Sequence, residues 1–167
     1  MTTSQNYSLV SLANNVKLGE NVKLEPFVCI RDNVTIGDNV WIKEYTCIYS
    51  GAKLGSNIMI RAQGFICENA RIGNKVEMGV NVKLVNHKKL CRYNPKQEDV
   101  VASPQIGNGV RIGSDVLLMP GVKIGDNSII MGNSSVYEDV PSKQIWGGDP
   151  AKFIKNVAPH LIIEDLE

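Results

Sequence analysis

A six-residue repeat runs through almost the whole chain and limits its possible folds more than any other feature. From Val10 the sequence divides into hexapeptides such as VKLGEN, VTIGDN and VKLVNH, and the phase resumes at Pro104 with PQIGNG and VRIGSD. The third residue of every hexapeptide is apolar, and up to Val82 the first residue is small or β-branched. Residues one and three of a strand point to the same face, so each hexapeptide begins as a short strand with one apolar side.

The second half of each hexapeptide is typical of a sharp corner. Glycine, asparagine and aspartate are common there, and these residues tolerate a left-handed backbone. Examples are Gly19, Asn21, Gly37, Asn39, Gly55, Asn57, Gly73 and Gly125. A strand and corner cannot bury their apolar side alone, so the units must stack. A strict period of six fits no helix, and the sequence predicts an all-β solenoid.

This pattern resembles the hexapeptide-repeat acyltransferases over nearly the whole chain. In that family three hexapeptides make one triangular coil and the coils wind left-handed, whereas the general rule for parallel crossovers favours the right hand. The resemblance therefore implies a left-handed parallel β-helix of about six coils, with one excursion loop and a short C-terminal tail that can form a helix. We expect the β-helix with its loop at 88–103 to occupy residues 1–140, and a closing segment with the tail to occupy 141–167.

Sixteen residues, Lys88 to Ser103, fit no phase of the repeat and should leave the solenoid as a loop. Such loops on rigid scaffolds often carry binding and catalytic residues. His87 stands directly before the loop, while the other histidine, His160, lies in the tail. A lone corner histidine is ordinarily just exposed, but the family places its catalytic histidine in this context. The resemblance thus implies His87 as the general base, a role suited to imidazole. Asn86 can orient the acceptor or the ring, although we expect a plain corner role.

The end of the chain resembles the closing segment of the same family. Asp139-Val140-Pro141 is followed by Gly148-Asp149-Pro150-Ala151-Lys152, which matches the family's "DVP" and "GxPAK". In the family, coenzyme A lies here in a groove between neighbouring subunits. Matched by position, the backbone of Gly121 and Gly132 would meet the pantetheine, and Lys152 and Lys155 would lie near the phosphates. Each residue has a simpler explanation as a corner glycine or a solvated lysine, and no GxGxxG or P-loop fingerprint is present.

The resemblance implies an acetyltransferase that uses acetyl-CoA as acyl donor and a sugar or sugar nucleotide as acceptor. Neutral His87 would take the proton of an acceptor hydroxyl or amine. That group would attack the thioester carbonyl while a backbone N–H stabilises the oxyanion. No acyl-enzyme is expected. The sequence leaves open the acceptor, the choice of oxygen or nitrogen, and acyl groups other than acetyl.

Some outward positions are unexpectedly apolar. With three hexapeptides per coil, Trp41 and Met59 fall on one face, and Phe65 and Leu117 on the next. Monomers seldom expose large apolar patches. The family forms homotrimers through such surfaces, so the resemblance implies a homotrimer with active sites between subunits. Coverage by the C-terminal tail is the alternative.

Charge, hydrophobicity and cysteine content argue against nucleic-acid binding, a membrane span and a metal site. The net charge of +1 gives no general reason to expect nucleic acid or an acidic membrane surface. The apolar stretches are too short for a membrane span, and residues 1–6 lack the regions of a signal peptide, so we expect a cytoplasmic protein. The four cysteines, at 29, 47, 67 and 91, have no metal-ligand spacing and should be reduced thiols.

Two other functions remain to be weighed. A zinc hydratase exists on this fold, but a catalytic zinc needs about three protein ligands, and His87 is the only histidine in the repeats. We therefore expect no metal. A non-catalytic scaffold would suit the outward apolar residues equally well, and affinity for coenzyme A separates it from an enzyme.

Overall fold

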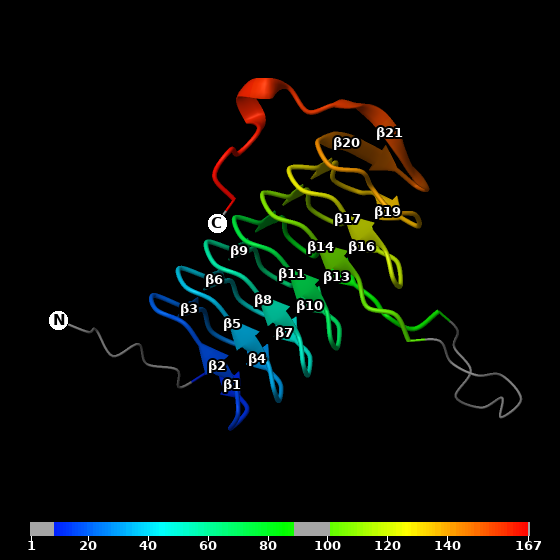
Figure 1. Cartoon of the computed structure of the whole chain (residues 1–167). Coiled ribbons are helices and arrows are strands. Elements are labelled where there is room, and N and C mark those ends of the chain that lie inside the picture. Colours follow the sequence, from blue (N-terminus) through cyan, green and yellow to red (C-terminus); the bar gives the residue numbers. More distant parts are fainter. Residues whose placement is uncertain (1–8, 89–100, 167) are drawn as a thin grey trace, which may run out of the picture.

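The computed structural model describes residues 9–88 and 101–166, which form a triangular solenoid (Figure 1). Sheet A contains β1 (Ser11–Leu12), β4 (Cys29–Ile30), β7 (Cys47–Ile48), β10 (Phe65–Ile66), β13 (Lys83–Leu84), β16 (Leu117–Leu118) and β19 (Ser135–Val136). Sheet B contains β2 (Lys17–Leu18), β5 (Thr35–Ile36), β8 (Lys53–Leu54), β11 (Arg71–Ile72), β14 (Gln105–Ile106) and β17 (Lys123–Ile124). Sheet C contains β3 (Lys23–Leu24), β6 (Trp41–Ile42), β9 (Met59–Ile60), β12 (Glu77–Met78), β15 (Arg111–Ile112), β18 (Ile129–Ile130), β20 (Gln144–Gly148) and β21 (Ala151–Asn156).

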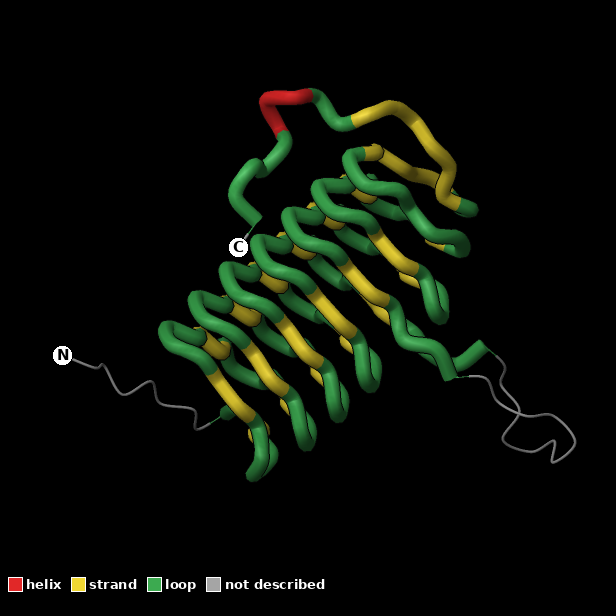
Figure 2. Tube along the Cα trace, viewed as in Figure 1, coloured by secondary structure: helices red, strands yellow, loops and turns green. Residues whose placement is uncertain are grey.

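The chain visits sheets A, B and C in turn, so successive strands of one sheet are three hexapeptides apart. Leu12 pairs with Ile30 in parallel register, and Ile48 pairs with Ile66 in the same way. The sequence spacing of paired residues increases once in each sheet, where Arg71 pairs with Gln105, Glu77 with Arg111 and Lys83 with Leu117, because the sixteen residues of the excursion intervene. The predicted left-handed parallel β-helix is confirmed, and its strands are short segments separated by corners (Figure 2).

The interior is a column of aliphatic side chains from the first and third residues of the hexapeptides. Ile42, Ile48, Ile60 and Ile66 are each 0% exposed. Burying one such side chain contributes about 1.5–3 kcal/mol, so the stacked column is the main source of stability. It holds the corners, where functional side chains can project, in a fixed register.

The glycines at the fourth position of the hexapeptide are needed for a different reason from the one predicted. The left-handed backbone falls on the sixth residue of the hexapeptide, as at Asn21, Asn39 and Asn57 with φ of 53°, 55° and 60°. Gly37 and Gly55, at the fourth position, are not left-handed. A Cβ on Gly55 would instead lie 2.3 Å from Oδ1 of Asn74 in the next coil. These glycines therefore make room for the stacking of coils.

The closing segment forms an antiparallel hairpin of β20 and β21 on top of sheet C. The tail then returns along the solenoid (Figure 1). Its only helical part among the described residues is a single 3-10 turn, η1 (Pro159–Leu161), so the expected helix is reduced to three residues. Within the described ranges no helix is long and apolar enough to cross a membrane.

Candidate active site

The excursion leaves and re-enters the solenoid at the corner between sheets A and B, through a short neck that fixes His87. His87 forms an antiparallel bridge with Val101, and the N–H of Ala102 donates to the carbonyl of Asn86 at 2.9 Å. Ser103 Oγ donates to the carbonyl of Glu68 in the preceding coil at 2.5 Å. His87 is exposed. The neck thus presents an imidazole to solvent from a fixed backbone. Residues 89–100 of the excursion lie outside the described residues.

Asn86 lies at a corner and differs from the other corner residues at its position in being buried. It stands fifth in its hexapeptide, where the backbone is not left-handed. It is 5% exposed, whereas every other described residue at a fifth position is exposed or half-buried. Its Nδ2 is buried and has no hydrogen-bond partner in the described structure. An unpaired buried donor costs about 1–3 kcal/mol, so the burial of this amide lowers the stability of the chain and calls for an explanation.

Gly121 lies at the same A–B corner, one coil beyond His87. Its φ is +82°, and a Cβ there would lie 3.2 Å from Cβ of Ala102 and 3.9 Å from Nζ of Lys88. The structure therefore brings Gly121 against the neck. Sequence reasoning missed Lys88, which extends from the neck towards Gly121 and adds a positive charge beside His87; its position directly after the histidine was the only signal.

Lys152 belongs to β21 and reaches the A–B corner of the last coil. Its Nζ lies 2.5 Å from Oε1 of Glu138, and both side chains are largely exposed. Lys155 lies further along β21, opposite Ile145, and is exposed. His87, Gly121 and Lys152 therefore follow one edge of the solenoid in the order of the coils. An exposed ion pair of this kind contributes little stability, so Lys152 can exchange Glu138 for another anion at small cost.

Gly132 is separate from this group. It lies at the corner between sheets C and A, and a Cβ there would meet the carbonyl oxygen of Ser114 at 3.1 Å. Sheet A therefore stands between Gly132 and the edge that carries His87. His160 is also distant along the fold, since its neighbour Leu161 accepts a hydrogen bond from Arg111 on the outer face of sheet C.

The outward apolar residues form two groups and not one patch. Trp41 and Met59 are neighbours on sheet C. Phe65 and Leu117 lie on sheet A with Lys83 between them. Trp41 is half-buried, because Nζ of Lys43 lies 3.6 Å from its ring centroid and its Nε1 donates to Glu25 at 2.8 Å.

The cysteines of the described chain are unpaired thiols in packed surroundings. Cys29 and Cys47 are neighbours in sheet A, and burial raises the pKa of Cys47, with a further contribution from Cys29. Burial raises the pKa of the Cys67 thiol to about 11. Cys91 lies outside the described residues. Within the described ranges no group of three or more His, Cys, Asp or Glu side chains could hold a metal ion.

Known proteins share both the repeat and the fold. The family described as bacterial transferase hexapeptide (six repeats) matches residues 15–48 and 103–138. A probable macrolide acetyltransferase from Lysinibacillus sphaericus is 56% identical over 50 residues, which cover 30% of this chain and 28% of the relative. Galactoside O-acetyltransferase from Escherichia coli K12 is 46% identical over 52 residues, or 31% and 26% of the two chains. The matched stretches thus span less than a third of these relatives.

Two solved structures share the architecture. AntD, an N-acyltransferase from Bacillus cereus solved with dTDP and coenzyme A, aligns with a TM-score of 0.74 at 19% identity, over 87% of this chain and 85% of AntD. A hexapeptide-repeat acetyltransferase from Vibrio cholerae, solved with acetyl-coenzyme A, aligns with a TM-score of 0.52 at 25% identity, over 84% and 70%. Together with the two matched segments, these structures show that the chain has the hexapeptide repeat and the β-helix fold of such transferases.

Proposed function

We propose that this protein is an acetyltransferase that moves an acetyl group from acetyl-CoA to a hydroxyl or amine of a sugar or sugar nucleotide. The observation that carries the proposal is the single exposed histidine on the fixed neck, with Gly121 against the neck and Lys152 further along the same edge. The acetyltransferase names of the relatives support the reaction, and the acetyl-coenzyme A held by the Vibrio cholerae protein supports the donor. The galactoside relative supports a sugar acceptor.

In the proposed reaction neutral His87 accepts the proton of the acceptor group as that group attacks the thioester carbonyl. The carbonyl oxygen gains negative charge, a backbone N–H donates to it, and coenzyme A leaves as the thiol after taking up a proton. Positioned proton transfer of this kind typically contributes about 10²–10⁴-fold to a rate. No covalent intermediate with the protein is involved.

Asn86 supplies a second polar group to this site. Its Nδ2 has no partner in the described structure, it directly precedes His87, and its backbone carbonyl accepts a hydrogen bond from Ala102 at the returning end of the excursion. Unpaired buried donors in folded proteins call for a specific partner, such as a ligand oxygen or a bound water. We propose that Asn86 orients the acceptor or the imidazole ring.

Coenzyme A is proposed to lie along the edge from Gly121 to Lys152, with its phosphates at Lys152 and Lys155. Gly132 would need to act from another part of the assembly, because sheet A separates it from His87 in one chain. We therefore propose a homotrimer with active sites between subunits, which the position of Gly132 supports. We also propose a cytoplasmic location, on which the position of Gly132 has no bearing.

Calorimetric titration of the purified chain with coenzyme A and with dephospho-coenzyme A tests the donor site. We expect saturable binding that weakens without the 3′-phosphate and weakens in Lys152→Ala. Glu138→Gln is the control for Lys152→Ala. It removes the ion-pair partner of Lys152 and keeps the lysine, so the affinity for coenzyme A should stay the same or rise. Absence of binding at millimolar coenzyme A would reject the enzyme and favour a non-catalytic scaffold.

A further inference from the structure

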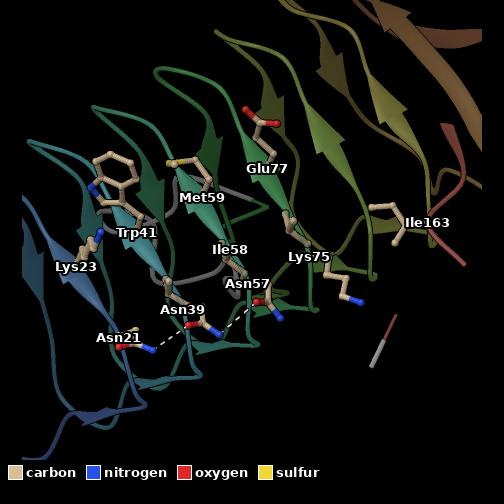
Figure 3. A pocket seen from close by; sticks show the side chains of 12 residues that line it. Asn21, Lys23, Asn39, Trp41, Asn57, Ile58, Met59, Lys75, Glu77 and Ile163 are labelled. Carbon is tan, nitrogen blue, oxygen red and sulfur yellow. Dashed lines mark hydrogen bonds between the residues drawn. The ribbon is translucent and has the colours of Figure 1, made fainter. Parts of the chain in front are cut away.

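A groove follows the corner between sheets B and C, bounded by the sixth-position corner residues on one side and the outward side chains of sheet C on the other. We call it the corner groove. Over the later coils the chain's own tail lies in it. Over the first three coils, which we call the lower groove, it is an open hollow (Figure 3). The hollow continues to Lys75 and Glu77 of the fourth coil, and its whole cavity volume is about 630 Å³. Ile163 of the tail is part of that lining, so the filled and open parts are continuous.

The tail shows how the corner groove holds a peptide. The Asn127 side chain makes two hydrogen bonds with the backbone of Ile163. Ile163 N donates to Oδ1 at 2.8 Å, and Nδ2 donates to the Ile163 carbonyl at 3.1 Å. Asn74 Nδ2 donates to the carbonyl of Leu166 at 3.3 Å. Lys75 Nζ lies 3.2 Å from Oδ2 of Asp165. Corner amides therefore bind main chain, and a corner lysine binds a carboxylate.

The lower groove has similar corner amides, and among the described residues no peptide segment binds them. Asn57, Asn39 and Asn21 stand at the corner position that Asn127 and Lys75 occupy in later coils. Their amides bond only along the ladder, at 3.1 Å from Asn21 to Asn39 and a long 3.4 Å from Asn39 to Asn57. The bond from Asn39 to Asn57 is longer than a normal hydrogen bond and therefore weak, so a bound main chain can compete with it.

The outer wall of the lower groove supplies an apolar surface and a cation. Trp41 and Met59 lie next to each other along it (Figure 3). Glu25 is 3.7 Å from Lys43, and Glu77 is 2.9 Å from Arg61, so both acids are already paired. Lys23 has no ion-pair partner among the described residues; its Nζ lies 5.5 Å from the centroid of the Trp41 ring. The lower groove therefore has one lysine in excess.

We propose that the lower groove binds an extended peptide segment of apolar and acidic residues, similar in character to the tail segment Ile162–Leu166. An aromatic anchor at a peptide site is a typical centre of binding energy, and main-chain recognition along an edge is a common mode for extended peptides. Coils are about 4.8 Å apart and an extended chain rises about 3.4 Å per residue. Lys23 is three coils from Lys75, the residue that binds Asp165. An extended peptide covers this distance with about four residues, so a carboxylate about that far from the Asp165 position would reach Lys23.

The test uses the full chain and a synthetic peptide, Leu-Ile-Ile-Glu-Asp-Leu-Glu, with the sequence of residues 161–167. In a Trp146→Phe background the fluorescence of Trp41 reports binding, and calorimetry gives affinities for the other variants. We expect saturable binding, and a dissociation constant that rises about tenfold or more in Trp41→Ala. Lys23→Gln should weaken binding of this peptide but not of its Gln-Asn-Gln analogue.

Matched variants separate the lower groove from its surroundings. Asn39→Gly removes a groove amide and keeps the left-handed backbone, and it should weaken binding. Asn133→Gly makes the same change at a distant corner, where φ is 56°, and should have no effect. The proposal is overturned if millimolar peptide gives no saturable signal, or if binding is unchanged in Trp41→Ala and lost in Asn127→Ala, because the peptide would then be displacing the tail. Coenzyme A binding is measured separately and does not enter either result.

Discussion

Gly55→Ala should destabilise the solenoid strongly although its backbone conformation suits alanine. The new Cβ would lie 2.3 Å from Oδ1 of Asn74 and 2.9 Å from the carbonyl of Gly73. That Oδ1 accepts a hydrogen bond from Ser56 N at 2.9 Å, which the displacement would break. Overpacking costs about 1–3 kcal/mol and an unpaired buried N–H about 1–3 kcal/mol, while the lost chain entropy of glycine offsets about 0.4–1 kcal/mol. We expect a net loss of about 2–4 kcal/mol in the free energy of unfolding.

Urea denaturation followed by circular dichroism measures this loss, and a double-mutant cycle tests its cause. Asn74→Ala removes the obstructing oxygen and the same hydrogen bond. The double variant should therefore lose about 1 kcal/mol less than the two single losses combined. Gly132→Ala is the control, because a Cβ there has its nearest contact at 3.1 Å and the next at 3.6 Å. The reasoning is refuted if Gly55→Ala stays within about 0.5 kcal/mol of the parent, or if the two losses simply add.

Three shorter predictions concern the tail, a thiol and the candidate site. Asn127→Ala removes both hydrogen bonds to Ile163, so amides of residues 161–166 should exchange faster with deuterium while those of β6 and β9 do not change; equal protection would contradict the assigned contacts. The pKa of Cys67 is raised from 9.0 to about 11, so its stabilising contribution is complete below pH 9 and is lost as the pH rises towards 11. In urea denaturation, the free energy of unfolding of the parent should therefore fall by about 2 kcal/mol more than that of Cys67→Ala across this pH range. Parallel plots of unfolding free energy against pH would contradict the raised pKa. Asn86→Leu removes a donor with no partner and should change stability by less than about 1 kcal/mol, yet lower acetyl transfer; a large loss of stability with normal transfer would make Asn86 purely structural.

The fold could be predicted because it depends on a local rule repeated many times. The residues of each hexapeptide predict its own strand and corner. The third-position residues, from Leu24 to Ile130, could therefore be placed in the core without any long-range information. The length of the excursion was also readable, since one hexapeptide ends at His87 and the next begins at Pro104. The role of Gly55 was not readable, because the reason for it is an asparagine one coil away.

The candidate site was only partly predictable for the same reason. The position of His87 before the loop could be read from the sequence, and so could the closing segment with Lys152. The contact of Lys88 with Gly121, the burial of Asn86, and the separation of Gly132 by sheet A depend on which corner each residue occupies. The tail was expected to allow a helix. Its backbone instead binds the side-chain amides of Asn127 and Asn74 along the B–C corner, and an extended chain fits this row of amides better than a helix.

We propose that His87 catalyses acetyl transfer from this edge of the solenoid. The most direct measurement is release of the coenzyme A thiol from acetyl-CoA across a panel of sugars and sugar nucleotides, with His87→Ala beside His160→Ala as the matched histidine control. We predict acceptor-dependent release that falls about 10²–10⁴-fold in His87→Ala, is unchanged in His160→Ala, and leaves coenzyme A affinity intact in both. Acceptor-dependent transfer that survives His87→Ala would contradict the assignment of the general base, and release with no acceptor dependence would contradict the proposed reaction.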